Sequence, residues 1–239
     1  MLHLSPTKIF TFEECPRRYK FIYIDGLAKF YRKDRPYFTM GENVHAALKE
    51  VYSLPPKSRT QAKLEEILWE KWAANRKGFA DEQEEENFKS RALEQVRWFA
   101  QNFDLTRTPF LTEATIQEEI SGLILEGRID RVDKESHSLH LIDYKTGFKP
   151  PNPDPRALYF YGLALEKHQK HRPPVSKVSY LYLADHELIT WEFNPEILSE
   201  TLRWLLNIAY QISEEREFPP REGKFCRNCD FLEICPARR

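Results

Sequence analysis

The first part of the chain has a helical pattern of apolar positions. Apolar side chains recur there every three or four residues, which is the spacing of an amphipathic helix. Ser5-Pro6 is a helix start signal, and Cys15-Pro16 marks a break. His45 lies on one predicted helix, beside its apolar stripe. The predicted helices cover one or two segments between residues 5 and 23, then 41–53, 61–77 and 82–103.

The period of the apolar positions changes near residue 112. From there to residue 146, three segments alternate between apolar and polar residues, which predicts an antiparallel meander of strands. The remaining pattern predicts a helix over 154–170, strands over 175–184 and 188–193, and a helix over 195–216. This order indicates an α/β (α+β) fold, in which helices flank a central mixed β-sheet, in one domain of 239 residues.

Composition and charge add limits to this picture. The formal net charge of -1 hides basic groups near both ends and an acidic run at 81–86, so nucleic-acid binding is not excluded. The chain shows neither a signal-peptide pattern nor an apolar run long enough to span a bilayer, so we expect a soluble, cytoplasmic protein with no membrane partner. In a reducing compartment its four cysteines are expected as metal ligands or free thiols.

Three charged residues between positions 127 and 147 are candidates for catalysis. Asp143 and Lys145 are two positions apart on a predicted strand, so their side chains point to the same face. If the strands pair across the polar turn at 134–138, Asp130 approaches Asp143, and two carboxylates can hold one or two divalent cations. The alternative is that these are ordinary turn or edge residues. Charges at the end of an apolar strand favour the functional reading, because they cost free energy unless paired or metal-bound.

Phosphodiester hydrolysis is a reaction that needs such a set. Mg²⁺ or Mn²⁺ held by Asp130 and Asp143 would supply a nucleophilic water and stabilise charge on the phosphate. Lys145 would orient the water or neutralise developing charge. His45 would add a nitrogen ligand, which favours Mn²⁺ over Mg²⁺. The alternative for His45 is a histidine satisfied by a neighbour on the helix surface or in the core.

The segments GENVHAAL, GRIDRVD and IDYKTG resemble, in this order, the motifs of the PD-(D/E)XK nuclease superfamily. The similarity is to its RecB-like branch, which includes the CRISPR-associated RecB-like exonucleases. This resemblance implies a restriction-endonuclease-like core in which His45, Asp130 and Asp143 bind the cation. It also implies that the backbone carbonyl of Tyr144 completes the shell and that Lys145 is catalytic.

One position departs from the pattern of that branch. In that branch a Gln-x-x-x-Tyr motif often follows the strand that carries the lysine. In this chain the residue four positions before Tyr161 is Ala157 and not glutamine. Tyr161 is therefore either a substrate contact or an aromatic packed in its helix interface. A carboxylate before the Asp130 strand, Glu118 or Glu119, would assist, and the spacing does not choose between them.

The cysteines form a second constellation. Cys226, Cys229 and Cys235 have the spacing C-x2-C-x5-C, and Cys15 is the other cysteine. Randomly placed cysteines would seldom have three members this close together, which favours metal ligation by four thiolates over free thiols. Zn²⁺ and a [4Fe-4S] cluster both fit the spacing. The similarity to AddB-type nucleases and CRISPR-associated exonucleases implies a structural [4Fe-4S] cluster that joins the two ends. It further implies three parts: residues 1–30 with 218–239 around the cluster, a helical insert at 38–110 carrying His45, and a nuclease core at 111–217.

Basic and aromatic residues surround these cysteines. If a metal joins the two ends, they merge into one patch suited to phosphates and unstacked bases. A solvated charged surface is the alternative. The residues of this patch are Arg17, Arg18, Tyr19 and Lys20 near the start of the chain, and Lys224, Phe225, Arg227 and Phe231 near its end.

These features predict a metal-dependent DNA exonuclease or end-processing nuclease that acts on single-stranded DNA or overhangs. DNA repair and recombination, or CRISPR adaptation and antiviral defence, would use such an enzyme, with a helicase or CRISPR integrase-type protein as partner. One alternative is a DNA-binding or assembly subunit with a nuclease fold, in which cleavage is weak or depends on a partner. Another is a zinc-stabilised module without iron.

Overall fold

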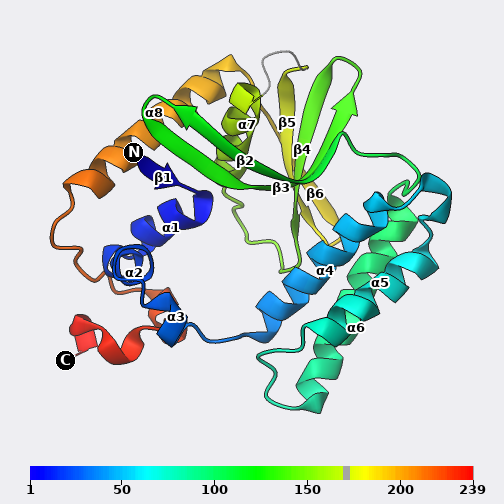
Figure 1. Cartoon of the computed structure of the whole chain (residues 1–239), viewed down its shortest axis with the longest axis horizontal. Coiled ribbons are helices and arrows are strands. Elements are labelled where there is room, and N and C mark those ends of the chain that lie inside the picture. The colour runs from blue at the N-terminus through cyan, green and yellow to red at the C-terminus, as the bar shows by residue number, and fades with distance from the viewer. Residues whose placement is uncertain (169–172, 239) are drawn as a thin grey trace.

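A computed structural model describes residues 1–168 and 173–238 (Figure 1). The strands are β1 (Leu2–Leu4), β2 (Leu111–Ile120), β3 (Leu123–Glu135), β4 (Ser138–Lys145), β5 (Val175–Tyr182) and β6 (Glu187–Glu192). The α-helices are α1 (Pro6–Glu14), α2 (Pro16–Tyr19), α3 (Ala28–Tyr31), α4 (Pro36–Ser53), α5 (Gln61–Ala74), α6 (Glu82–Asn102), α7 (Arg156–His168) and α8 (Pro195–Glu214). Shorter turns are a π-helical turn at Lys20–Ile24 and 3-10 turns at Pro56–Ser58, Lys224–Asn228, Leu232–Ile234 and Pro236–Arg238.

All of these strands form one mixed sheet. Its order is β1-β3-β4-β5-β6, and β2 pairs with β3. The strands β2, β3 and β4 form the predicted antiparallel meander, and the turn between β3 and β4 is closed by Glu135 and Ser138. Strands β4 and β5 are parallel, so α7 crosses over between them. The short β1, parallel to β3, is not predicted from the sequence because three residues are too few to show an alternation.

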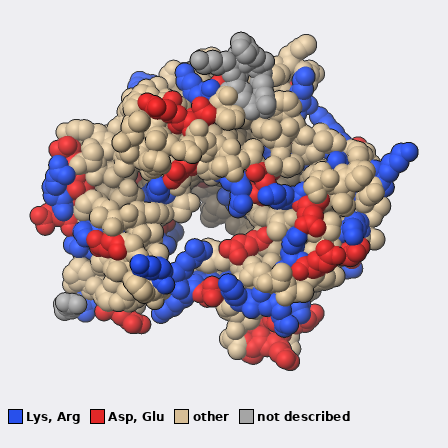
Figure 2. Space-filling model, in the orientation of Figure 1, with Lys and Arg blue, Asp and Glu red and all other residues tan. Residues whose placement is uncertain are grey.

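Helices cover both faces of the sheet (Figure 1). Core residues of α1, α7 and α8 pack with Leu139 and Leu141 of β4, whereas core residues of α4, α5 and α6 pack with Ile142 and Tyr144. Successive strand residues point to opposite faces, so one strand contributes to both cores. Figure 2 shows that the molecule is hollowed at its centre, with Lys and Arg side chains, and some Asp and Glu side chains, on the border of the hollow. The predicted fold class, a mixed sheet flanked by helices, is confirmed.

The observed helix ends differ a little from the predicted ones. α4 begins at Pro36, before the predicted start, because proline fits the first helical turn whereas the apolar stripe begins only at Met40. The predicted break is confirmed, since Cys15 is extended, with φ of -159°, between α1 and α2. Of the helix predicted to end at 170, residues 169 and 170 lie outside the described residues. In the part of the chain that the structure describes, no helix is long and apolar enough to cross a membrane.

A buried carboxylate joins α5 to α6. Glu85 accepts hydrogen bonds from Trp72 Nε1 at 2.9 Å and from both Nε and Nη2 of Arg76 at 2.7 Å. The Arg76 hydrogen bonds, with that of Trp72, outweigh the effect of burial and lower the pKa of Glu85 to about 2. A carboxylate with a lowered pKa stabilises the fold above its ordinary pKa of 4.5, and this contribution is lost as the pH falls toward 2.

We expect Glu85→Gln to lower the free energy of unfolding at neutral pH by about 1–3 kcal/mol, the range for a buried hydrogen bond to a charged group. The same substitution should flatten the loss of stability between pH 4.5 and 2. Urea unfolding at a series of pH values measures both effects. Glu86→Gln is the matched control, because the Glu86 side chain is 69% exposed on the same helix. Equal unfolding curves for the two variants would contradict the role given to Glu85.

Candidate metal centre

The strands β3 and β4 separate where Asp130 and Asp143 lie. Their ladder ends at the pair Arg131 and Ile142, one position short of the two aspartates. Beyond it, Asp130 Oδ2 accepts a hydrogen bond of 2.8 Å from the backbone N–H of Tyr144. The predicted pairing across the polar turn therefore brings Asp130 to the Asp143-Tyr144 segment, at the end of a buried strand.

His45 and Glu113 complete a cluster around Asp130. His45 comes from α4, and its Nδ1 lies 3.2 Å from Asp130 Oδ1 and 4.0 Å from Glu113 Oε1. One candidate ligand atom from each of the three residues lies within 4.8 Å of the other two. His45 is therefore not a lone surface histidine, because its ring nitrogen faces two carboxylates from different strands.

Glu113 is the carboxylate of β2 that reaches this cluster, rather than Glu118 or Glu119 as the sequence suggests. Glu118 bonds to His168, and Glu119 is exposed. Glu113 has a positive φ of 48°, and the β2–β3 register skips it, so β2 is irregular at this point. The Glu113 side chain is only 5% exposed. Sequence alternation assumes a regular ladder, which is why this irregularity cannot be read from it.

Asp143 and Lys145 form an ion pair beside the cluster. Lys145 Nζ lies 2.5 Å from Asp143 Oδ2 and 4.8 Å from the centre of the Tyr180 ring. The pair confirms that the two side chains share one face of β4. The Asp143 side chain is 14% exposed and the Lys145 side chain is 42% exposed, so the lysine is the less enclosed member of the pair.

The carboxylates of this site repel one another. Burial and then the charge of Asp130 raise the pKa of Glu113. Burial also raises the pKa of Asp143, against the opposing charge of Lys145. Burial lowers the pKa of His45, but the hydrogen bond and charge of Asp130 outweigh it, so the net pKa is raised. A divalent cation would neutralise this excess negative charge, and one imidazole nitrogen with several carboxylate oxygens is a donor set that fits Mn²⁺ or Mg²⁺.

Tyr161 approaches the site from α7. A Cβ added to Gly127 would lie 2.5 Å from Tyr161 Cε1, so the ring rests on the backbone of β3 and only glycine leaves room for it. Burial, with the charges of Asp143 and Asp130, raises the pKa of the Tyr161 hydroxyl. Ala157, four residues before Tyr161, is 8% exposed. Tyr161 therefore packs in the core and also lies in the field of the two aspartates.

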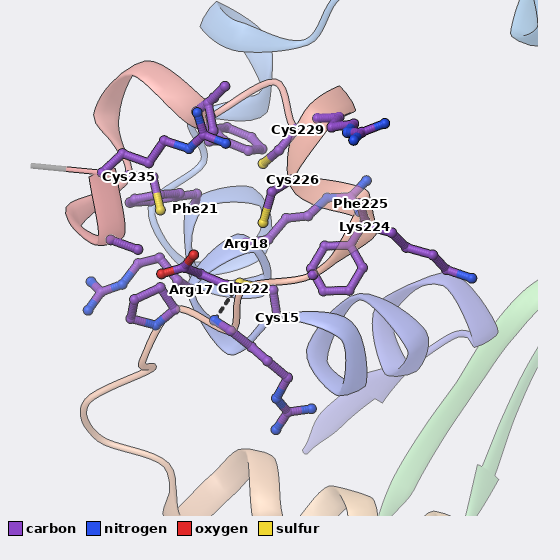
Figure 3. Close-up of a pocket in the computed structure, with 18 residues that line it drawn as sticks. Cys15, Arg17, Arg18, Phe21, Glu222, Lys224, Phe225, Cys226, Cys229 and Cys235 are labelled. Carbon is purple, nitrogen blue, oxygen red and sulfur yellow. Dashed lines mark hydrogen bonds between the residues drawn. The ribbon is translucent and has the colours of Figure 1, made fainter.

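The four cysteines line one cavity of about 500 Å³ (Figure 3). Cys15 comes from the break between α1 and α2, whereas Cys226, Cys229 and Cys235 come from the C-terminal turns. None of the four is in a disulfide, and Cys15 Sγ accepts a hydrogen bond of 3.4 Å from the N–H of Arg221. The fold thus brings the two ends of the chain together. Four thiols on one cavity are a donor set that fits a thiolate-bound metal group.

The basic and aromatic residues near the cysteines are only partly available to a ligand. Tyr19 and Phe231 are 5% and 2% exposed, so these two rings form core contacts and cannot stack on bases. This corrects the expectation that they belong to an open patch. Arg17 and Arg18 do line the cysteine cavity. Arg18 forms an ion pair with Glu14 at 3.0 Å, which leaves its guanidinium partly satisfied within the protein.

Comparison with known proteins identifies the family of this chain. The family model described as PD-(D/E)XK nuclease superfamily matches residues 3–236. A crystal structure from Eubacterium rectale, named "Putative exonuclease", shares the fold with a TM-score of 0.56 at 11% identity, over 95% of this chain and 86% of that chain. The crystal structure of SSO0001 aligns over 99% of this chain and 87% of that chain, with a TM-score of 0.47 and 15% identity. Among curated proteins, none matches the sequence. Because the family model spans nearly its whole length, the chain belongs to the PD-(D/E)XK nuclease superfamily.

Proposed function

We propose that this protein is a divalent-metal-dependent deoxyribonuclease, an exonuclease or end-processing nuclease that acts on single-stranded DNA or overhangs. The observation that carries the proposal is the cluster of His45, Glu113 and Asp130 beside the Asp143–Lys145 ion pair, in a chain of a nuclease superfamily. Isolated acidic clusters are common on proteins. This one is mostly enclosed, includes an imidazole and has an ammonium group next to it.

The proposed roles come from the family resemblance. His45, Asp130 and Asp143 would hold Mn²⁺ or Mg²⁺, with the Tyr144 carbonyl completing the shell. When bound, the metal supplies a nucleophilic water and stabilises charge on the scissile phosphate. Lys145 would hold the water in line or neutralise the developing charge, because its side chain is the more exposed member of the pair.

Glu113 and Tyr161 would have supporting roles. Glu113 is a further carboxylate within reach of the cation, and Arg128 Nε holds its second oxygen at 2.8 Å. Tyr161 would contact the substrate from the α7 side. The central hollow, bordered by Lys and Arg side chains, supports a single strand or overhang as substrate, because phosphates are attracted to such a border and a chain end can enter an opening (Figure 2).

We also propose that the protein belongs to the RecB-like branch and carries a structural [4Fe-4S] cluster on Cys15, Cys226, Cys229 and Cys235, rather than Zn²⁺. The shared cavity of the four thiols supports a metal group. Residues 1–30 with 218–239 would then form a cluster subdomain, 38–110 a helical insert and 111–217 the nuclease core. DNA repair and recombination or CRISPR adaptation, with a helicase or integrase-type partner, is the setting that the resemblance suggests.

A second candidate function is a DNA-binding or assembly subunit that cleaves weakly or only with a partner. The observation that favours it is Ala157, which is buried four residues before Tyr161, where the RecB-like pattern often has a glutamine. A buried alanine offers no polar group to a substrate.

Incubation of DNA strands labelled at either end, with Mn²⁺ or with EDTA, tests the proposal. We expect a product ladder that depends on Mn²⁺, starts from one end, and forms on single strands and overhangs. Rapid cleavage of a closed circular single strand would contradict an exonuclease. If no metal-dependent product forms at high enzyme concentration, the binding subunit becomes the better assignment.

A further inference from the structure

A group of exposed aromatic side chains lies where α3 leads into α4. The rings of Phe30, Tyr37 and Phe38 are 72%, 47% and 47% exposed. Tyr37 and Phe38 contact each other, with ring centroids 4.5 Å apart. Phe30 precedes this contacting pair in the chain, on α3. Exposed rings in contact with each other commonly mark binding surfaces. We refer to these three rings, together with Lys29 and Arg32, as the α3–α4 surface.

Two cations of this surface lie against its rings. Lys29 Nζ is 4.8 Å from the Phe30 ring centre, and Arg32 Cζ is 6.0 Å from that of Phe38. Among the described residues, neither cation forms an ion pair with a carboxylate. Residues 29–38, KFYRKDRPYF, contain four basic side chains and one acidic side chain. The surface therefore has a local positive charge, and in Figure 2 Lys and Arg side chains gather beside the hollow, over α3 and the start of α4.

The segment between α3 and α4 is held firmly in place. Gly78 has a φ of +78°, and a Cβ there would lie 2.5 Å from the backbone nitrogen of Arg35, so the two backbones are in close contact. Arg35 Nη2 pairs with Asp230 Oδ1 at 2.7 Å. A groove of about 260 Å³ opens beside this contact, and its lining includes Arg32, Phe38 and Lys77. A surface that is already ordered loses less entropy when it binds a ligand.

Part of the α3–α4 surface lies on the same side of α4 as His45 of the candidate metal centre. Phe38 and His45 are seven residues apart on α4, which is close to two helical turns, so both side chains lie on the same side of the helix. The separation along the helix axis is about 10 Å. A ligand that follows this side of α4 would pass from the exposed rings to the His45 cluster.

We propose that single-stranded nucleic acid binds the α3–α4 surface, with bases stacked on Phe30, Tyr37 and Phe38 and phosphates near Lys29 and Arg32. Exposed rings interleaved with unpaired cations suit a strand with unstacked bases and one negative charge per phosphate. This inference rests on the proposed function and adds to it, because it assigns the approach of the substrate to residues outside the metal centre.

The test measures binding of a fluorescein-labelled oligothymidylate in EDTA, where no metal-dependent cleavage occurs. The double substitution Phe30→Ala with Phe38→Ala should weaken binding by about 30-fold or more, since each of the two stacked bases contributes about 1–3 kcal/mol. Phe38→Trp should keep the affinity. Tyr210→Ala, which removes a ring that is 66% exposed on α8, is the matched control and should bind normally.

A second measurement examines the cations. Lys29→Gln with Arg32→Gln should reduce the slope of log affinity against log salt by about 1.4, or roughly 0.7 for each lost phosphate contact. Unchanged affinity in the Phe30 and Phe38 double variant, with normal folding by circular dichroism, would overturn the inference and leave the rings to an apolar protein partner. Because binding is measured without cleavage, an absence of nuclease activity would count against the proposed function and not against this surface.

Discussion

Replacing Asp130 with asparagine is expected to reduce Mn²⁺-dependent cleavage of single-stranded DNA by about 10³-fold or more, because the carboxylate charge holds the cation that activates the water. Asparagine has nearly the same size, and its oxygen can still accept the hydrogen bond from the Tyr144 N–H. The substitution therefore removes charge with little change in shape. Initial rates on a labelled strand at saturating Mn²⁺ provide the measurement.

The stability of the same variant makes the test specific. Asp130 lies among other carboxylates, and its charge raises the pKa of Glu113. Removing that charge relieves this repulsion but also weakens the contact of Asp130 with His45, so the two effects oppose each other and the unfolding temperature should change little. Glu119→Gln, which removes an exposed carboxylate from the same sheet, is the control and should cleave at the normal rate. Full activity in the Asp130 variant would rule out this metal centre.

Replacing Cys235 with serine is expected to lower the midpoint of thermal unfolding by about 10 °C, which corresponds to roughly 3–5 kcal/mol in a chain of this length. The C-terminal segment consists of short 3-10 turns, which bury little on their own. A metal group bound also by Cys15 would tie this segment to the opposite end of the chain. Loss of one ligand would release a constraint that spans almost the whole sequence.

Metal content and stability should change together in this variant. The Cys235 side chain is only partly buried, so serine alone should disturb packing little. Protein purified without oxygen should contain iron and sulfide in the native form and lose both in the variant. The unfolding midpoint of the variant should then match that of native protein stripped of metal. If the native protein is colourless and contains zinc, the bound group is Zn²⁺ and not the cluster. If the variant keeps the metal content of the native protein, ligation by Cys235 is contradicted.

Local patterns predict most of the secondary structure correctly. The alternation between residues 112 and 146 indicates three strands, and the polar residues near 134–138 indicate the turn that pairs the second with the third. That pairing, together with the two-residue spacing of Asp143 and Lys145, already implies that Asp130, Asp143 and Lys145 lie close together. Such predictions succeed because the period of a strand and the position of a turn depend on neighbouring residues.

Other members of the candidate site depend on contacts between distant segments. His45 reaches Asp130 because α4 packs over the end of β3 and β4, and no local pattern specifies that placement. Glu113 faces the cluster because β2 is irregular there. The burial of Tyr19 and Phe231, which removes them from any base-binding patch, also follows from packing between the two ends of the chain.

The sequence by itself therefore determined the strand meander, the shared face of Asp143 and Lys145, and the four thiols at the two ends of the chain, because spacing along the backbone is enough for each. Only the tertiary structure decided that Glu113 joins His45 and Asp130, that four cysteines share one cavity, and that Phe30, Tyr37 and Phe38 are exposed. Those facts depend on how the helices pack against the sheet and against each other, which is set by the sum of many contacts between residues far apart in the chain.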